Sequence, residues 1–558
     1  MNAQSAALAP PPPALMAASI AKALPAELSH SPLLGILGVI LGAGVVTLAG
    51  RMLTLGLADL KGHVGMSFDQ GAWIGTSFNV ALMFIGPFTV YLGGLLGPRR
   101  VLLASAAAFT LLSAFLPFVH SYSLLVAALV FAGLTSGTFY PLTLAFALRS
   151  IPLFFLPFTL ALYATFVDFA VNIAPGLYGW FRDHLGWPWM FWVSAVITPA
   201  MMLCIYYGIP ANPSPKRSGA VPSFAGFLYF SLGLASLFAA LDQGERLDWW
   251  HSGLFTALIF SGSFLVISSL VRRLYSPNPL IDLPYLRYPN TLLLAGALIF
   301  FRFALLSTVI LVPQSLAIRG FEADQIGPSV FWTALPQIAV AFIAALLLLS
   351  KVDSRLLMAV GFTLMAFACL LNADYTSAWS ASNYYRTELL MGVGQSFAFI
   401  GLVSTIVLQA LFSGGLTRPQ WALTFSAFFH VIRLFGGQIG VAFMTHFISH
   451  REKIHSNLLG LHVQQGNWST DLNARQLTAG LFSKSAGLAE AGGRAATLIA
   501  ARIRLQAYAL TMNDGYHVVA WACVLVLLLI FFLRRAPLDY GDLSLLQEKR
   551  AHHEGARA

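Results

Sequence analysis

Fourteen apolar runs, each long enough for a membrane-spanning helix, determine what this 558-residue chain can fold into. About 20 consecutive apolar residues cross the hydrocarbon core of a bilayer as a helix. Hydrophobic residues make up 58% of the chain and charged residues only 10%, which excludes an ordinary soluble protein. We therefore predict an all-α polytopic membrane protein. The runs lie at 33–58, 72–96, 101–119, 122–148, 153–179, 187–208, 223–241, 252–271, 291–314, 326–350, 356–372, 388–411, 421–447 and 515–533.

Basic residues are distributed unequally between the loops on the two sides of the predicted membrane. Loops after even-numbered runs contain pairs such as Arg99–Arg100 and Arg272–Arg273, whereas the short loops after odd-numbered runs carry single cations. Cytoplasmic loops carry the excess of Lys and Arg in membrane proteins. Both termini are therefore predicted to be cytoplasmic. The formal charge of +10 then requires no nucleic-acid partner.

The sequence lacks the patterns expected of an enzyme or a metalloprotein. Cys204, Cys369 and Cys523 all lie in apolar runs, with no spacing typical of a metal site or a disulfide framework. The phosphate-binding pattern GxxxxGK[ST] is absent, so direct ATP hydrolysis is not expected. We predict a protein that is not an enzyme and has no cofactor beyond a proton gradient.

An acidic residue lies near the middle of the run 153–179. This is Asp168, and Asn172 follows one helical turn later. A carboxyl at that depth is costly and normally faces protein or a water-filled cavity. Asp168 is therefore either a structural acid, paired with a buried Arg or a backbone group, or a proton-titrating carboxylate of a transporter. We favour the second interpretation.

Arg51 lies in the outer half of the first run, at a depth comparable to that of Asp168. A buried arginine needs a partner, and its long side chain can bridge a difference of about one turn. We predict an Arg51–Asp168 ion pair that couples proton binding to transport. The alternative is that Arg51 reaches the outer membrane surface.

Several short motifs together resemble a known family. They are Gln70–Ala81 (QGAWIGTSFNVA), Gly93–Arg100 (GGLLGPRR), Leu241–Trp249 (LDQGERLDW), Asn278–Leu283 (NPLIDL) and Val312–Gln314 (VPQ). In this order they resemble the major facilitator superfamily, and within it the fourteen-helix drug/proton antiporters of the EmrB type. The resemblance covers nearly the whole chain beyond the N-terminal tail. It implies two six-helix bundles around a central cavity, with two further helices inserted between them, in the inner (cytoplasmic) membrane of a bacterium.

The chain departs from that family at its proton-coupling positions. By position, the acidic residue of the family's first helix falls at about Ala49, and the arginine of its fourth-helix motif falls near Leu129. The fifth-helix motif is reduced to Pro175, Gly176 and Gly179. Asp168 is then the best replacement for the missing acid, and transport direction does not follow from the resemblance alone.

The second half contributes two more buried cations. Arg302 lies mid-run, and Arg433 is preceded by His430 and followed by Gly436 and Gly437. Each has a structural alternative: a charge satisfied by carbonyls for Arg302, a packing anchor for Arg433 and a satisfied interior histidine for His430.

If Arg51, Arg302 and Arg433 share a cavity with Asp168, that cavity is net positive and favours anionic amphiphiles over lipophilic cations. Phe166 and Phe169 are predicted to supply apolar walls, although packing against lipid or core is the plainer interpretation of such rings. With Asn172 and His430, these residues form the predicted substrate site.

The sequence suggests five regions. They are a disordered cytoplasmic tail (1–31), an N-terminal six-helix bundle (32–210), two inserted helices with a linker (211–290), a C-terminal six-helix bundle (291–535) with a periplasmic loop (450–514), and a short charged, disordered cytoplasmic tail (536–558). The loop contains a segment spaced like an amphipathic helix. It is either a docking surface for a periplasmic adaptor of a tripartite pump with an outer-membrane channel, or a lid on the transporter itself.

We therefore expect a proton-coupled secondary efflux transporter that exports amphiphilic, carboxylate-bearing toxic compounds by alternating access. The alternatives are an importer or facilitator of organic anions without proton antiport, and a membrane scaffold that transports nothing.

Overall fold

A computed structural model describes residues 31–150, 154–209, 224–275, 289–412, 419–464, 466–537 and 539–543. The predicted N-terminal tail up to residue 30, the NPLIDL motif and the chain after residue 543 lie outside these residues. Within the described residues, fourteen helices are long and apolar enough to cross a membrane, as predicted. No strand occurs in the described ranges.

The spans of the first half are α2 (Pro32–Leu55), α4 (Phe68–Leu96), α5 (Pro98–Phe115), α6 and α7 (Tyr122–Ser136 and Phe139–Ser150), α8 (Leu156–His184) and α9 (Trp189–Gly208). The inserted pair is α10 (Phe224–Gln243) and α11 (Gly253–Tyr275). The second half contains α13, η4 and α14 (Pro289–Ala304, Ser307–Leu311 and Val312–Ala317), α15 and α16 (Ala323–Ala334 and Gln337–Leu349), α17 (Ser354–Asn372), α18 (Tyr385–Phe412), α19 (Pro419–Gly460) and α21 (Leu488–Phe532). The short helices are α3 (Leu57–Val64), α20 (Trp468–Phe482), η2 (Leu116–Phe118), η3 (Trp249–His251) and η5 (Ala381–Tyr384).

Local signals in the sequence set several helix ends. The Ser67 hydroxyl accepts from the backbone N–H of Gln70, and the Gln70 side chain accepts from the backbone N–H of Ser67, so α4 begins with a capping box four residues before the predicted apolar run. Pro98 occupies the first turn of α5, where a missing N–H costs nothing. Such polar starts are invisible to hydropathy alone.

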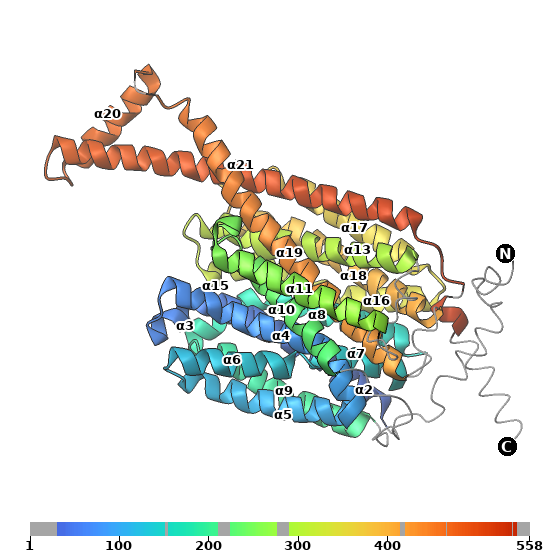
Figure 1. Cartoon of the computed structure of the whole chain (residues 1–558). Coiled ribbons are helices and arrows are strands. Elements are labelled where there is room, and N and C mark those ends of the chain that lie inside the picture. Colours follow the sequence, from blue (N-terminus) through green and yellow to red (C-terminus); the bar gives the residue numbers. More distant parts are fainter. Residues whose placement is uncertain are drawn as a thin grey trace, which may run out of the picture.

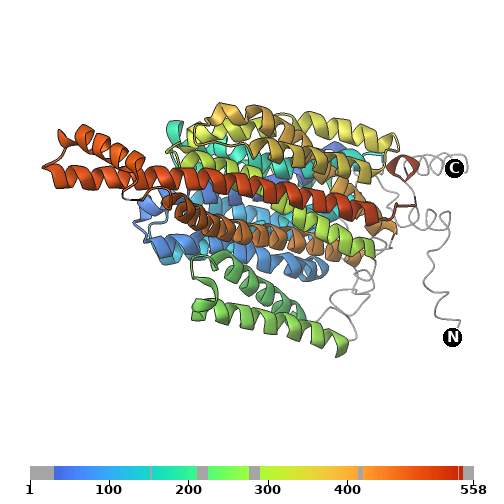
Figure 2. The same cartoon turned by 90° about the horizontal axis from the view of Figure 1, so that it is seen from above.

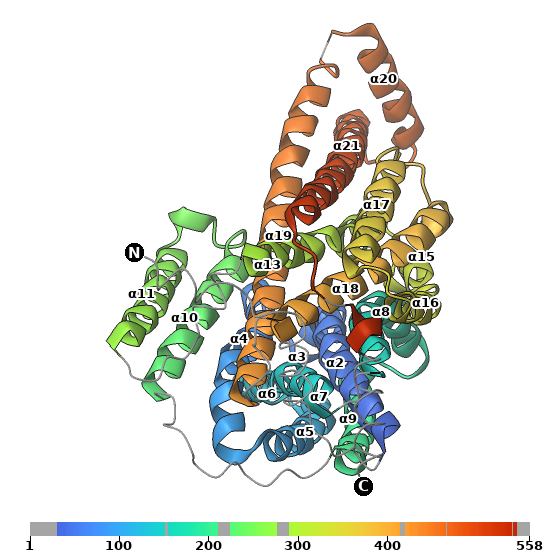
Figure 3. The ribbon, with the colours of Figure 1, turned by 90° about the vertical axis from the view of Figure 1, so that its right-hand side faces the viewer.

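The helices form two bundles that meet along α8 (Figure 3). In the first bundle α2 packs against α7, α8 and α9, and in the second α17 packs against α18 and α21. Helix α8 also packs against α15, α16 and α18 of the second bundle. Because both bundles cover α8, 72% of the residues in its most apolar 18-residue stretch are buried. This helix contains Asp168.

Of the inserted pair, α10 packs against α4 and α19 and so touches both bundles, whereas α11 packs against α10 on the outside (Figure 3). Arg246, after α10, forms an ion pair of 2.6 Å with Asp69 at the start of α4. Glu245 accepts a hydrogen bond of 2.8 Å from His446 of α19. Burial raises the pKa of Glu245, but hydrogen bonds from His446, Trp249 and Ser449 outweigh it and hold that pKa below its usual range. The segment between α10 and α11 is therefore bonded to both bundles, through Asp69 of α4 and His446 of α19.

The predicted loop 450–514 is instead a helical arm, which corrects the boundaries predicted for the last two spans. Helix α19 continues to Gly460 and α21 begins at Leu488, so the two helices leave the bundle unbroken, with α20 across their ends (Figures 1 and 2). At its base, Asp514 of α21 accepts hydrogen bonds from Arg451 and His455 of α19. A hydropathy scan misses this continuity because a helix in water no longer needs apolar residues.

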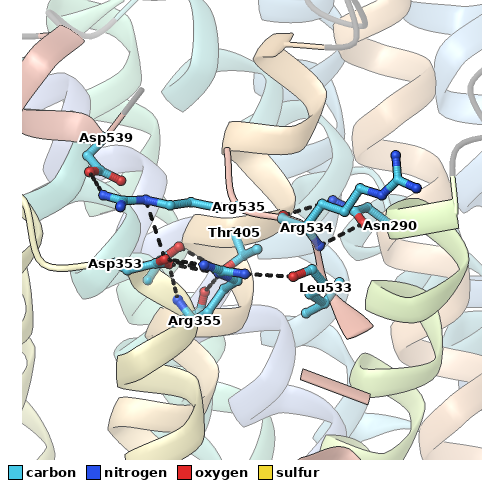
Figure 4. A network of polar contacts seen from close by, with 10 residues as sticks. Asn290, Asp353, Arg355, Thr405, Leu533, Arg534, Arg535 and Asp539 are labelled. Carbon is cyan, nitrogen blue, oxygen red and sulfur yellow. Dashed lines mark hydrogen bonds and ion pairs between the residues drawn. The ribbon is translucent and has the colours of Figure 1, made fainter. Parts of the chain in front are cut away.

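At the opposite end, the described chain after α21 folds back onto the second bundle, so the prediction of a disordered tail is wrong for residues 536–537 and 539–543. Tyr540 is buried, and its hydroxyl donates a hydrogen bond of 2.8 Å to the Ser404 carbonyl. Arg535 pairs with Asp539 at 2.7 Å and contacts Asp353 at 3.7 Å (Figure 4). One buried aromatic ring and these ion pairs are enough to order a charged segment.

Candidate functional site

Asp168 lies on the face of α8 that is directed toward the second bundle. Its side chain is 1% exposed, and neither carboxyl oxygen accepts a hydrogen bond from a described residue. Asn172, Gly176 and Gly179 follow at helical spacing. Asn172 donates to Gln395 of α18 at 2.9 Å, and Gly176 and Gly179 approach the backbone of α15. The predicted acid is therefore at the junction of the two bundles.

Two cations of the second bundle act on the Asp168 carboxylate: Arg302 of α13 and Arg433 of α19. Buried Nε and Nη1 atoms of Arg302, and Nε of Arg433, make no hydrogen bond to the described residues. Because these atoms have no hydrogen-bond partner among the described residues, both arginines keep donors for a further group. The structure thus brings together three residues that the sequence singled out separately.

The predicted glycines make room for this cluster. A Cβ on Gly437 would lie 3.3 Å from the Nε and Nη2 atoms of Arg302, and one on Gly436 would lie 2.9 Å from the Cα of Ile299. Helices α13 and α19 therefore approach closely, and the Arg302 guanidinium fits beside the bare backbone of Gly437.

Aromatic rings enclose the cationic side of the cluster. The Arg433 guanidinium lies 3.7 Å from the ring centroid of Tyr140 on α7, and that ring stacks on His430 with centroids 5.2 Å apart. His430 is buried against Gly86 of α4, where a Cβ would lie 2.8 Å from its ring. These contacts hold Arg433 in place by a cation–π interaction. They also place His430 beside the predicted cluster.

The predicted Arg51–Asp168 ion pair is not formed, and this prediction is wrong for the conformation seen here. Arg51 Nη2 instead donates a hydrogen bond of 3.1 Å to the Val309 carbonyl. Pro313 lies four residues after Val309 and has no N–H, so the usual helical donor for that carbonyl is missing. The chain forms a π-helical turn over Ser307–Leu311 at this point. Arg51 thus satisfies a carbonyl freed by proline.

Phe166 and Phe169 are both half-buried, with ring centroids 5.8 Å apart on α8. Phe166 lies beside α2, where a Cβ on Gly44 would contact its ring at 3.5 Å. Pro175 lies within α8 one residue before Gly176. Phe166, Phe169 and Pro175 therefore all belong to α8, the helix that contains Asp168.

A second buried acid was missed by the sequence analysis. Glu388 of α18 is 0% exposed and accepts hydrogen bonds from Thr333 Oγ1 at 2.8 Å, Thr308 Oγ1 at 3.1 Å and Asn372 Nδ2 at 3.3 Å. The predicted run began at residue 388, which placed this acid at a membrane surface. Gln395, two turns later on the same face, was the available sign of a buried polar stripe.

Hydrogen bonds connect Glu388 across the bundle junction to Asn172, which lies one helical turn from Asp168. Asn172 donates to Gln395, and Gln395 Nε2 donates to Thr308 Oγ1 at 3.1 Å. Thr308 in turn donates to Glu388. Gln337 of α16 also donates to Gln395, at 3.3 Å. The path starts one turn from Asp168 and passes through α18 and η4.

Buried charges at the junction of two helical bundles, in a chain with fourteen candidate membrane spans, define a membrane transporter. Comparison with known proteins agrees: the sequence profile of the Major Facilitator Superfamily matches residues 39–441. The chain belongs to this superfamily.

Relatives specify the branch of the superfamily. The probable multidrug resistance protein EmrY of Escherichia coli is 24% identical over 92% of this chain and 98% of its own length. The multidrug export protein EmrB of the same organism is 25% identical over 86% of this chain and 90% of its own length. The fatty acid resistance protein FarB of Neisseria gonorrhoeae is 24% identical over 72% of this chain and 78% of its own. The predicted EmrB-like family is confirmed.

Solved structures confirm the fold. The proton:xylose symporter XylE has a TM-score of 0.53 at 13% identity, covering 92% of this chain and 98% of XylE. The human organic anion transporter MFSD10 has a TM-score of 0.52 at 14% identity, covering 89% of this chain and 99% of MFSD10. Together with the relatives, they show a multi-pass efflux transporter of the EmrB type that is not an enzyme.

Proposed function

We propose that this protein exports amphiphilic, carboxylate-bearing compounds by alternating access, driven by protons that enter the cell. One observation supports this proposal above the others. Asp168 is fully buried with both oxygens free of hydrogen bonds, and it faces two arginines that have unused N–H groups. A substrate carboxylate can take those N–H groups in the bidentate geometry that arginine favours.

The balance of charge favours an anion. Arg302 and Arg433 act on a single carboxylate, so the cluster stays positive with Asp168 ionised and becomes more positive when Asp168 takes up a proton. Tyr140, Phe166 and Phe169 supply aromatic surface for the apolar part of the substrate. A lipophilic cation would meet two positive charges.

This balance of charge determines whether the proton and the substrate anion strengthen or weaken each other's binding. Protonation of Asp168 removes a negative charge beside the arginines, so the anion binds more tightly to the protonated protein. By linkage, the anion also strengthens proton binding. Export with proton entry then requires that the anion leaves toward the outside before Asp168 takes up its proton. The proton-loaded, anion-free protein returns, and Asp168 releases its proton on the cytoplasmic side.

We would test this with purified protein in proteoliposomes under an imposed pH gradient. Wild type is expected to move an amphiphilic carboxylate against its gradient and to leave a lipophilic cation unmoved. Asp168→Asn should abolish coupled flux but retain downhill flux, and should lose the pH dependence of anion affinity, about 5- to 150-fold for couplings of this kind. Asp183→Asn, an exposed acid on the same helix, is the matched control. Equal behaviour of wild type and Asp168→Asn would refute the role of Asp168.

The same cluster also suits an importer or facilitator of organic anions, because a proton and an anion that favour each other's binding can travel together. The direction of anion movement separates the two functions. A pH gradient that is acidic outside expels the anion in an exporter and draws it in with a symporting importer. A facilitator only speeds equilibration.

We further propose that both termini face the cytoplasm and that the arm extends into the periplasm, where it binds an adaptor protein of a tripartite pump. Apolar side chains at the end of the arm support this proposal: Leu461, Trp468 and Leu488 are 62%, 77% and 69% exposed. Large exposed apolar groups of this kind mark protein-binding surfaces. The arm also reaches beyond the bundle (Figure 2).

A further inference from the structure

We propose that Glu388 is a second proton-binding carboxyl of the transport cycle, coupled to the bundle junction through Gln395 and Asn172. The proposal rests on the proton-coupled exchange proposed above. It assigns a role to a residue that lies outside the Asp168 cluster. It also implies that two protons enter for each substrate molecule that leaves.

The first argument is the absence of a counter-charge among the described residues around Glu388. Its hydrogen-bond donors, Thr308, Thr333 and Asn372, are all neutral, and no cation acts on it. Burial of an isolated carboxylate carries a large desolvation cost, which hydrogen bonds from three neutral groups offset only in part. A buried carboxyl without a counter-charge is therefore able to bind a proton.

The other titratable groups near Glu388 do not supply a charge. Three such groups interact electrostatically with Glu388: Cys369 of α17, Tyr384 of η5 and Tyr516 of α21. All three are ordinarily neutral. Arg51 is a cation near the polar path, but its guanidinium donates to the carbonyl of Val309, the residue after Thr308.

The second argument is that the site can accommodate both protonation states. The ionised carboxylate accepts the three hydrogen bonds described above. The Oδ1 atom of Asn372 is buried and has no hydrogen-bond partner among the described residues, although its Nδ2 atom lies 3.3 Å from Glu388. Rotation of this amide gives a protonated Glu388 an acceptor for its new O–H. Neither state is then left with an unsatisfied carboxyl.

The third argument is the direction of the hydrogen bonds. Asn172 donates to Gln395, Gln395 to Thr308 and Thr308 to Glu388, so the donors in this path point toward the carboxyl. A negative charge on Glu388 strengthens the path, and a proton weakens it. The Asn172–Gln395 bond joins α8 of the first bundle to α18 of the second. Proton binding at Glu388 therefore loosens a bond that holds the two bundles together.

The test uses the full-length protein in two measurements. Infrared difference spectra of the purified protein detect protonated carboxyls without any transport. Wild type should show buried carboxyl bands that titrate with pH, and Glu388→Gln should lose the band that Asp168→Asn retains. In proteoliposomes, Glu388→Gln should halve the number of protons exchanged per substrate, from two to one.

Two variants separate a proton-binding role from a structural one. Glu388→Asp keeps a carboxyl and should keep both the infrared band and two protons per substrate. Asp374→Asn removes an exposed acid two residues after Asn372, just beyond the end of α17, and should change neither readout. If Glu388→Gln loses no titrating band relative to wild type and keeps two protons per substrate, or if a sodium gradient replaces the pH gradient, the proposal fails.

Failure of the proposed function gives a different result. If Asp168→Asn leaves coupled flux intact while Glu388→Gln removes the band and one proton, the role proposed for Asp168 is lost and that of Glu388 stands. A Glu388 band that is present at every pH overturns the proposal whatever Asp168 does.

Discussion

Arg51 shows how a buried cation can be stabilised without an acid. Its partner is the Val309 carbonyl, which lacks a helical donor because Pro313 has no N–H. The pairing joins α2 of the first bundle to η4 of the second, next to Thr308 of the polar path. A charged hydrogen bond to a buried carbonyl is worth about 1.5–3 kcal/mol.

Arg51→Leu should therefore lower the unfolding free energy by about 1–3 kcal/mol, because it removes the charged donor from the partly buried Val309 carbonyl. Thermal unfolding in detergent measures the effect. Arg51→Lys keeps a charged donor and should lose less stability. If Arg51→Leu instead abolishes proton coupling at unchanged stability, Arg51 acts with Asp168 after all.

At this scale the sequence predicts which residues matter better than it predicts their partners. Asp168, Arg302 and Arg433 stand out because a charge inside an apolar run is costly wherever it points. The partner of Arg51 depends on how α2 and α13 are rotated about their axes, which hydropathy does not determine. Glu388 was missed because its helix turns out to begin earlier than the apolar run does.

At the scale of helices, α8 and α15 make the closest contact between the bundles. A Cβ on Gly327 would lie 2.6 Å from the Cα of Gly176, whereas a Cβ on Gly176 would meet nothing nearer than 3.8 Å. Arg182 at the end of α8 pairs with Glu322 at 3.0 Å, just before α15. The two helices therefore fit only while position 327 has no side chain.

Gly327→Ala should force α8 and α15 apart, at a cost of about 1–3 kcal/mol for overpacking, and should reduce transport several-fold. Gly176→Ala, on the other side of the same contact, should be tolerated. Transport rates and thermal unfolding of the two variants provide the comparison. Equal effects would mean that α15 does not pack on α8 as seen here.

The number of spans and the fold class could be predicted from the sequence because both depend on apolar length, which a bilayer enforces. The arm could not be predicted in this way. Outside the membrane, Arg451, His455 and Asp514 hold two helices together by charge, and no apolar run marks where those helices end.

At the scale of the whole molecule, the bundle and the arm have separable tasks in the proposed function. Replacing residues 461–487 with a short Gly–Ser linker removes the end of the arm but keeps its base, including the contact between Arg451 and Asp514. This variant should transport normally in proteoliposomes but should fail to protect cells from the exported compound. Normal protection by the shortened protein would argue against an adaptor.

Helices α19 and α21 pass from the second bundle into the arm without a break, and at 45 residues α21 is about 68 Å long. A continuous helix behaves as a lever. A small tilt of the second bundle during alternating access therefore becomes a larger sideways displacement at α20, in proportion to the distance from the pivot. The arm would then transmit each transport cycle mechanically, so that a partner bound at its end is pushed in step with the passage of substrate.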